Sequence, residues 1–161
     1  MSLLCSALLW AEPEMIPIED VDLQGRSAPV FSLPLFEGGT IDLEKLRGKP
    51  VVLSFWASWC GPCRFELPEL SRIQPLYPDV HFIAVNVDKD KNEAQKFLSR
   101  VQFSLPIAWD NEALTLGEYS VISMPTMFLI DAQGTVQYVK VGYSQEKKLV
   151  ELEDKIKGLK K

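Results

Sequence analysis

The sequence predicts an α/β fold in which helices cover both faces of a mixed central sheet. Three runs of the chain, residues 51–57, 81–87 and 126–130, are almost wholly apolar, as strands buried on both faces are. Segments with apolar residues at helical spacing lie between and after these runs. This order of strands and helices is typical of a sheet whose parallel strands are joined by helices. At 161 residues, the chain is long enough for one ordinary domain.

The N-terminal part of the chain is expected to be an extension over residues 1–25, followed by the folded domain over residues 26–161. Residues 3–11 are apolar and acidic residues follow, a pattern similar to the later part of a secretory signal peptide. The stretch is too short to cross a bilayer, because a transmembrane helix needs roughly 18 or more apolar residues. A truncated signal, an anchor and a plain extension stay open for residues 1–11, and Cys5 is interpreted as a spare thiol.

The first structured elements are expected to be a β-hairpin and a helical turn. Residues 31–36 and 40–43 have the alternating pattern of strands, and residues 37–39 supply turn chemistry between them. Pro34 has no backbone N–H to donate, so we expect its strand at a sheet edge. A short helical turn over residues 44–47 follows.

The segment between the first two buried strands is predicted to be a helix over residues 61–76. Its apolar residues Phe65, Leu67, Leu70 and Ile73 recur at helical spacing. The remaining expected elements are helices at 92–101, 112–119 and 145–159, and strands at 105–109 and 135–141, the latter paired with 126–130 through a turn at 131–134.

Composition excludes several classes of function. Hydrophobic residues make up 47% of the chain and charged residues 24%, which indicates a packed soluble globule and not a disordered chain. The net charge of −5 argues against a surface that binds nucleic acid. Three cysteines are too few, and odd in number, for a framework of structural disulfides.

Two cysteines are placed where a buried strand passes into a helix, in the run Trp-Cys-Gly-Pro-Cys at residues 59–63. Sites in open α/β sheets lie at the carboxyl ends of strands, so this position suits chemistry. In a first helical turn, the three-residue spacing of Cys60 and Cys63 brings their Cβ atoms to about 5–6 Å, from which a disulfide can close. Pro62 suits an early helical position, and Gly61 keeps the loop slim enough for a partner's backbone to approach.

The helix N-terminus is expected to make one of these cysteines reactive. Unpaired backbone N–H groups favour the thiolate over the thiol at Cys60, which makes it the attacking sulfur. Cys63, deeper in the helix, would then resolve the mixed disulfide. The competing interpretation is half of a zinc site, but only Cys5, His81 and carboxylates remain as further ligands. We therefore favour redox chemistry and expect no metal.

The WCGPC run, its strand-to-helix setting and Met124-Pro125-Thr126 ahead of a strand resemble the thioredoxin superfamily. More narrowly, residues 26–159 are similar to the TlpA/ResA-like extracytoplasmic thiol–disulfide oxidoreductases, which include cytochrome c maturation reductases. Residues 28–50 resemble the N-terminal β-hairpin extension of that group, and residues 92–119 its helix-and-strand insertion before the cis-proline. The resemblance implies a thioredoxin fold with both additions.

The resemblance also implies roles for single residues. Cys60 matches the nucleophile and Cys63 the resolving cysteine. Pro125 matches a cis-proline that faces the disulfide, so that the backbone of Met124 can offer a short strand edge to a substrate. Glu66 matches a glutamate three residues after the second cysteine, and helical spacing places it on the face of Cys63, where a partly buried carboxylate could take its proton.

Other positions around the cysteines are expected to bind substrate or to pack. Ser54 falls where thioredoxin has a buried aspartate, and a serine cannot titrate usefully. The alternative for Glu66 is a surface glutamate helped by the helix dipole. Trp56 and Trp59 are interpreted as core or rim residues beside the site. Substrate contacts are expected at Trp59, Gly61, Pro62, Met124 and Pro125.

The expected function is thiol–disulfide exchange with protein disulfides through Cys60 and Cys63, as a reductant outside the cytoplasm. No cofactor is implied beyond the redox-active cysteines. The expected partners are protein disulfides, with apocytochrome c among the candidates, and a membrane thiol electron donor; the protein is expected to be a monomer. The alternatives are a general thioredoxin-like reductase or an oxidant, a non-catalytic binding module, and a peroxiredoxin-like peroxidase. The last is disfavoured because Leu53 and Ala57 replace the proline and threonine that peroxidases need.

Overall fold

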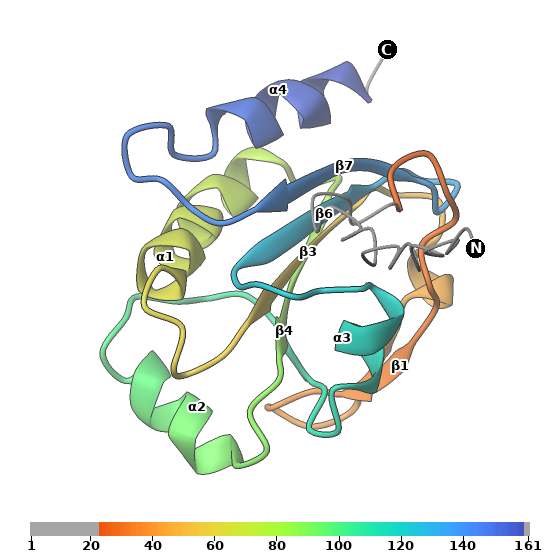
Figure 1. Ribbon diagram of the computed structural model, residues 1–161. Helices are drawn as coiled ribbons and strands as arrows, with labels where there is room; N and C mark the ends of the chain where they lie inside the picture. Colours follow the sequence, from red (N-terminus) through yellow and green to blue (C-terminus); the bar gives the residue numbers. More distant parts are fainter. Residues whose placement is uncertain (1–22, 160–161) are drawn as a thin grey trace, which may run out of the picture.

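A five-stranded mixed sheet forms the centre of the computed structural model, which describes residues 23–159 (Figure 1). Its strands are β3 (Val51–Trp56), β4 (His81–Asn86), β5 (Ile107–Trp109), β6 (Thr126–Ile130) and β7 (Val136–Val141). The order across the sheet is β5-β4-β3-β6-β7, with β3, β4 and β5 parallel and with β6 antiparallel to both β3 and β7. The predicted α/β class and mixed sheet are therefore confirmed.

The N-terminal β-hairpin is also confirmed, as a separate two-stranded sheet. Its strands β1 (Ser32–Pro34) and β2 (Thr40–Asp42) pair antiparallel, and the short 3-10 helix η1 (Glu44–Leu46) follows. The end of the hairpin lies against the edge strand β5, where the N–H of Phe36 donates to the carbonyl of Ile107 at 2.9 Å. The hairpin thus covers one end of the main sheet.

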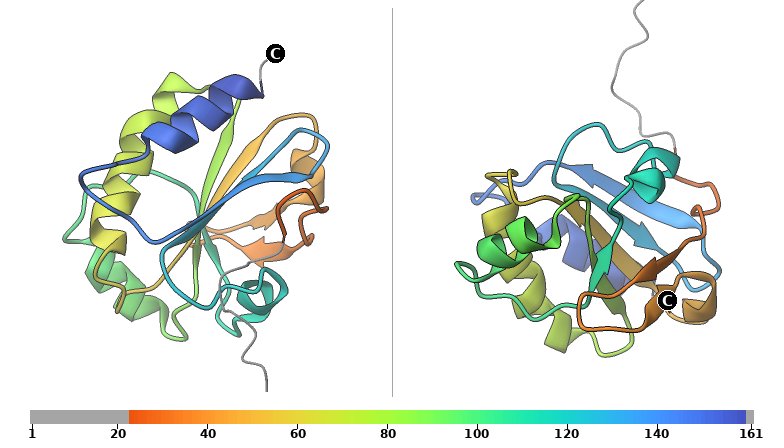
Figure 2. Two further views of the ribbon diagram at one scale, coloured as in Figure 1. Left: turned by 45° about the horizontal axis from the view of Figure 1, so that its top comes forward. Right: turned by 90° about the horizontal axis from the view of Figure 1, so that it is seen from below.

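Helices lie on both faces of the main sheet (Figure 2). The helices α1 (Cys63–Ile73), α2 (Lys91–Leu98) and α4 (Val150–Gly158) pack on one face, and the short 3-10 helix η2 (Gln74–Leu76) continues the chain directly after α1. The hairpin, η1 and the short helix α3 (Leu114–Glu118) pack on the other. Within residues 23–159, no helix is long and apolar enough to cross a membrane.

The central strand β3 is buried along its whole length because both of its faces are covered. Phe55 points to the face that the hairpin covers and packs there in a cluster of buried apolar side chains, with its ring centroid 5.3 Å from that of Tyr119. Val52 points to the opposite face and packs in the cluster that contains Leu70 of α1. Side chains alternate along a strand, so Ser54 lies on the same face as Val52, beneath α1.

Two helices begin later than the sequence pattern predicts, because the backbone before each of them is left-handed. Ala113 has φ 55°, and α3 starts at Leu114 instead of residue 112. Lys148 has φ 45°, and α4 starts at Val150 instead of residue 145. A non-glycine residue in this conformation cannot continue a right-handed helix, and hydrophobic periodicity does not report it.

Phe65 does not belong to the buried stripe of α1, although its apolar side chain suggested a place there. It is 46% exposed, whereas the buried residues of α1 are Cys63, Glu66, Leu67, Leu70 and Ile73. That set follows the i, i+3, i+4 pattern from Cys63, and Phe65 lies outside it. The glutamate occupies a core position that an apolar residue would ordinarily take.

Candidate active site

The two cysteines of the WCGPC run form a disulfide at the junction of β3 and α1. Their Cα atoms are 5.4 Å apart, within the range usual for disulfides. Cys63 is completely buried, and Cys60 is 4% exposed. The two cysteines therefore differ in exposure: Cys60 keeps a small exposed area, whereas Cys63, at the first position of α1, has none.

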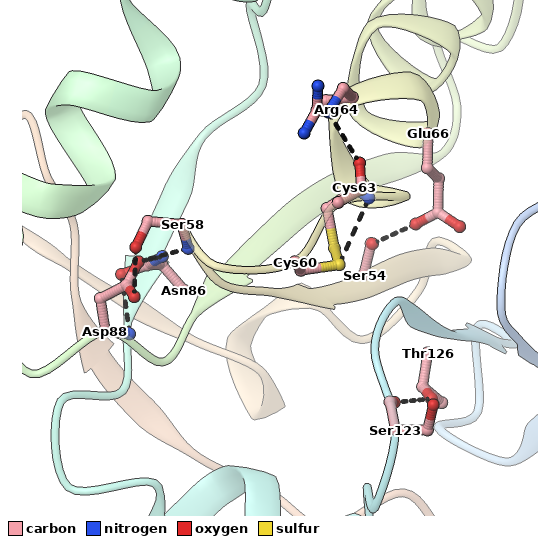
Figure 3. Close-up of a disulfide and its surroundings, with 11 residues drawn as sticks. Ser54, Ser58, Cys60, Cys63, Arg64, Glu66, Asn86, Asp88, Ser123 and Thr126 are labelled. Carbon is pink, nitrogen blue, oxygen red and sulfur yellow. Dashed lines mark hydrogen bonds between the residues drawn. A yellow bond between two sulfur atoms is a disulfide. The ribbon is translucent and has the colours of Figure 1, made fainter.

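The N-terminus of α1 directs a backbone donor at Cys60. The N–H of Cys63 donates to Sγ of Cys60 at 3.3 Å (Figure 3). Pro62 precedes the helix with φ −64°, a helical value that its ring favours. In the reduced protein, the same donor and the helix dipole favour the thiolate of Cys60, which is the form that attacks disulfides.

The loop before Cys60 is held in place by Asp88, a residue that the sequence analysis did not single out. The backbone N–H and the hydroxyl of Ser58 donate to the two carboxylate oxygens of Asp88 at 2.8 and 2.9 Å. Asn86, at the end of β4, donates to the same carboxylate at 2.8 Å. Asp88 follows β4, a buried strand beside the one that precedes the cysteines. This position after a buried strand was the only feature of the sequence that could have marked Asp88 as a site residue.

Glu66 is a buried residue and not a surface glutamate. It is 1% exposed, and its Oε1 accepts a hydrogen bond from the hydroxyl of Ser54 at 2.5 Å. Its Oε2 has no hydrogen-bond partner among the described residues. Burial raises the pKa of Glu66 from 4.5 to about 7, although the Ser54 hydrogen bond and the charge of Lys140 act in the opposite direction. A carboxyl with this pKa exchanges a proton readily near neutral pH.

Ser54 therefore belongs to the site as a hydrogen-bond donor, although the sequence analysis assigned it no role because a serine does not titrate. It lies on β3 with no exposed surface, and its hydroxyl connects the central strand to the carboxyl of Glu66 on α1 (Figure 3). The residue supplies a donor to an acid that comes from another element. The sequence analysis compared Ser54 alone with the aspartate of thioredoxin, and this comparison could not show that Ser54 pairs with Glu66.

The Met124–Pro125 peptide bond is cis, and Pro125 is buried. The hydroxyl of Thr126 donates to the carbonyl of Ser123 at 2.6 Å, which ties the two sides of the proline together. Met124 is partly buried and packs against the cluster that contains Cys60, Cys63 and Trp56. The loop expected to meet substrates thus packs on the same cluster of side chains as the disulfide.

The two tryptophans of the site differ in exposure. Trp56 has no exposed surface and packs against Phe97 of α2, with ring centroids 5.3 Å apart. Trp59 is 70% exposed and lines a surface hollow together with Arg64 and Phe97. Trp56 is therefore a core residue, and Trp59 stands at the rim.

A family model described as the AhpC/TSA family matches residues 24–139 of the chain. The chain belongs to this family. Among its relatives, the thiol–disulfide oxidoreductase ResA of Geobacillus thermodenitrificans is 39% identical over 120 residues, which cover 73% of this chain and 69% of that protein. The thioredoxin-like protein YneN of Bacillus subtilis is 34% identical over 130 residues, which cover 78% of this chain and 76% of that protein.

Solved structures of thiol–disulfide oxidoreductases are similar to this chain as well. A Chlorobium tepidum protein, assigned to the thiol:disulfide interchange protein DsbE type, has a TM-score of 0.79 at 38% identity and covers 84% of this chain and 96% of its own. A secreted Mycobacterium tuberculosis disulfide oxidoreductase has a TM-score of 0.67 at 28% identity, and the match covers 80% of this chain and 96% of that protein. The thioredoxin-like fold and the enzyme class, a thiol–disulfide oxidoreductase of the ResA/DsbE type, are therefore confirmed.

Proposed function

We propose that this protein reduces disulfides of other proteins through the Cys60–Cys63 dithiol, in a compartment outside the cytoplasm. The observation that carries the proposal is the unequal burial of the two disulfide-bonded cysteines at the N-terminus of α1, in a cluster against which Met124 packs. Cys60 is the nucleophile and Cys63 the resolving cysteine. Trp59, Gly61, Pro62, Met124 and Pro125 form the surface that meets the substrate.

The first step forms a mixed disulfide. The thiolate of Cys60 attacks one sulfur of the substrate disulfide, a bond forms between these two sulfurs, and the substrate's own S–S bond breaks. The released substrate thiolate takes a proton from solvent. Neither the backbone N–H nor the carbonyl of Met124 has a hydrogen-bond partner in the part of the chain that the structure describes, so both can pair with an extended substrate segment.

The second step releases the reduced substrate. Glu66, as the carboxylate, accepts the proton of the Cys63 thiol, and the Cys63 thiolate attacks Sγ of Cys60. The Cys60–Cys63 disulfide forms, the mixed disulfide breaks, and the second substrate thiolate leaves and is protonated. Two electrons have passed from the dithiol to the substrate. A membrane thiol electron donor then restores the dithiol by the same exchange in reverse.

Cytochrome c maturation is the process that we assign to this reductase, with the disulfide of an apocytochrome c as its substrate. The support is the similarity to ResA and DsbE-type proteins over more than two thirds of the chain. The location outside the cytoplasm rests on relatives that are described as secreted and as an exposed lipoprotein. Residues 1–11, which suggested a signal peptide, lie outside the described residues.

The alternatives differ in what the cysteines do. A peroxidase needs a polar group beside the attacking sulfur, whereas Leu53 and Ala57 are aliphatic and completely buried. A non-catalytic binding module would leave Cys60 without reactivity. An oxidant uses the same residues as a reductant, and its reduction potential, measured against glutathione, is the property that separates the two.

The test is to trap the mixed disulfide. In a Cys63→Ala variant the second step cannot occur, so Cys60 should accumulate adducts with client proteins that a reducing agent releases. Cys60→Ala is the matched control and should form none. Absence of adducts in Cys63→Ala, in a protein whose fold is intact, would remove Cys60 as the nucleophile.

A further inference from the structure

A row of three residues crosses the sheet beneath α1. Ser54 of β3 pairs with Met127 of β6, and Met127 pairs with Lys140 of β7. Residues directly opposite each other in antiparallel strands place their side chains on the same face. Lys140 therefore lies on the face of the sheet that carries α1, in the same row as the serine that donates to Glu66. The two strand spacings between Ser54 and Lys140 amount to about 10 Å.

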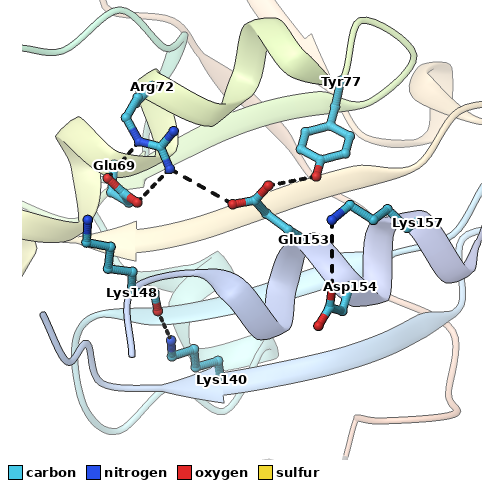
Figure 4. Close-up of polar contacts among 8 residues, drawn as sticks. All are labelled: Glu69, Arg72, Tyr77, Lys140, Lys148, Glu153, Asp154 and Lys157. Carbon is cyan, nitrogen blue, oxygen red and sulfur yellow. Dashed lines mark hydrogen bonds and ion pairs between the residues drawn. The ribbon is translucent and has the colours of Figure 1, made fainter. Parts of the chain in front are cut away.

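The ammonium group of Lys140 is held in position. Its Nζ donates to the carbonyl of Lys148 at 2.9 Å (Figure 4), and it lies 5.8 Å from the centroid of the Tyr143 ring. Lys140 is partly buried, and both partners belong to the segment that leads from β7 to α4. The charge is thus fixed between β7 and this segment, in contrast to the free charge of a fully exposed lysine.

We propose that Lys140 is a positioning residue for the proton transfer at the active site, whose positive charge, fixed on the α1 face of the sheet, stabilises the carboxylate form of the buried Glu66 side chain. The inference rests on the proposed function, because it concerns the carboxylate that accepts the proton of Cys63. Lys140 touches neither the substrate nor the sulfurs, and it acts through Glu66.

Among the described residues, Lys140 is the charged side chain that stabilises the ionised form of Glu66. Ser54 faces it from β3 and is neutral, and Cys63 on its own helix is bound in the disulfide. Lys140 acts on it from β7 and lowers its pKa. Tyr143, from the segment after β7, is a neutral phenol whose pKa is raised by burial and by the charges of Glu69 and Glu66. Burial alone would keep the carboxyl protonated, and a protonated carboxyl cannot accept a proton.

A purely structural role for Lys140 is the competing explanation, since its bond to Lys148 also fastens the segment before α4. The two explanations differ in what they predict for Glu66. Loss of an anchor lowers the stability of the fold and leaves the ionisation of Glu66 unchanged. Loss of the nearby charge shifts that ionisation even where the fold is intact.

The experiment is a titration of Glu66 by carboxyl carbon NMR in the oxidised protein, where neither Cys60 nor Cys63 titrates. Lys140→Gln should raise the pKa of Glu66 by about half a unit or more, a roughly threefold change in the ionisation constant. Lys140→Arg keeps the charge and should leave the pKa within about 0.2 units of the wild-type value. Lys147→Gln removes the same net charge from an exposed position and is the matched control.

The proposal is overturned if Lys140→Gln leaves the pKa of Glu66 unchanged, or if Lys147→Gln shifts it as much. If Lys140→Gln does not fold, the comparison is made with Lys140→Met, which keeps the length of the side chain. The titration uses no substrate, so it can succeed even if Cys63→Ala forms no adducts. Failure of the trapping experiment therefore removes the proposed function, and failure of the titration removes only the role of Lys140.

Discussion

Replacement of Glu66 by glutamine should make the protein more stable at alkaline pH. The pKa of Glu66 is about 7 in the folded protein and 4.5 where the residue is unperturbed, as in the unfolded chain. Between these two values the unfolded chain ionises while the folded protein keeps its proton, so the free energy of unfolding falls as the pH rises from 4.5 to 7. The difference of 2.5 units corresponds to about 3 kcal/mol. The loss levels off about one pH unit above 7, where the carboxyl is ionised in the folded protein as well.

Glutamine has nearly the same shape and can still accept the hydrogen bond of Ser54, but it does not ionise. The assay is urea denaturation of the oxidised wild-type and Glu66→Gln proteins at pH 5 and pH 8. His81, whose pKa is lowered by burial and by Lys49, contributes equally to both proteins and cancels in the comparison. The stability of the variant relative to wild type should increase by about 2–3 kcal/mol from pH 5 to pH 8, because part of the full effect already occurs below pH 5. An equal response of both proteins to pH would refute the assignment of Glu66 as a buried acid with a raised pKa.

Two further substitutions test the neighbours of the disulfide. Ser54→Ala removes a hydrogen bond that is stronger to the carboxylate than to the neutral acid by about 1–1.5 kcal/mol, so the pKa of Glu66 should rise by about one unit. The rate of the resolving step at pH 7 should then fall about fivefold, and its pH profile should move to higher pH by the same unit; an unmoved profile would contradict the role of Ser54. Asp88→Ala leaves the donors of Ser58 and Asn86 without their acceptor, and denaturation should report a loss of about 2–3 kcal/mol. A loss below about 0.5 kcal/mol would show that the loop before Cys60 holds its shape without Asp88.

Elements with strong local signals were predictable from the sequence. The run at residues 51–57 is apolar because β3 is covered on both faces, and this burial leaves a direct trace in composition. The spacing of Cys60 and Cys63 was equally informative, because two cysteines three residues apart at the start of a helix lie close enough for a disulfide, although the helix begins only at Cys63. The position of the cis-proline was predicted by resemblance alone, as nothing in the local sequence of Met124-Pro125 determines the isomer.

Features that depend on contacts between distant segments were not predictable. The hydrogen bond from Ser54 to Glu66 joins residues twelve apart on different elements, and that from Ser58 to Asp88 joins residues thirty apart. No periodicity encodes such pairs. The exposure of Phe65 was missed for a related reason: its apolar side chain resembles a core residue, but the helix turns its neighbours inward and leaves it in contact with solvent.

The complete burial of Cys63 determines which sulfur of the disulfide an incoming thiolate can attack. A disulfide with two accessible sulfurs can be opened at either one, which produces two isomeric adducts and two possible leaving groups. Here an incoming reductant meets the edge of Cys60 alone, since the other sulfur is sealed by protein. Every mixed disulfide consequently forms at Cys60. Steric access therefore fixes the order in which the bonds break, whatever the intrinsic reactivity of the two sulfurs.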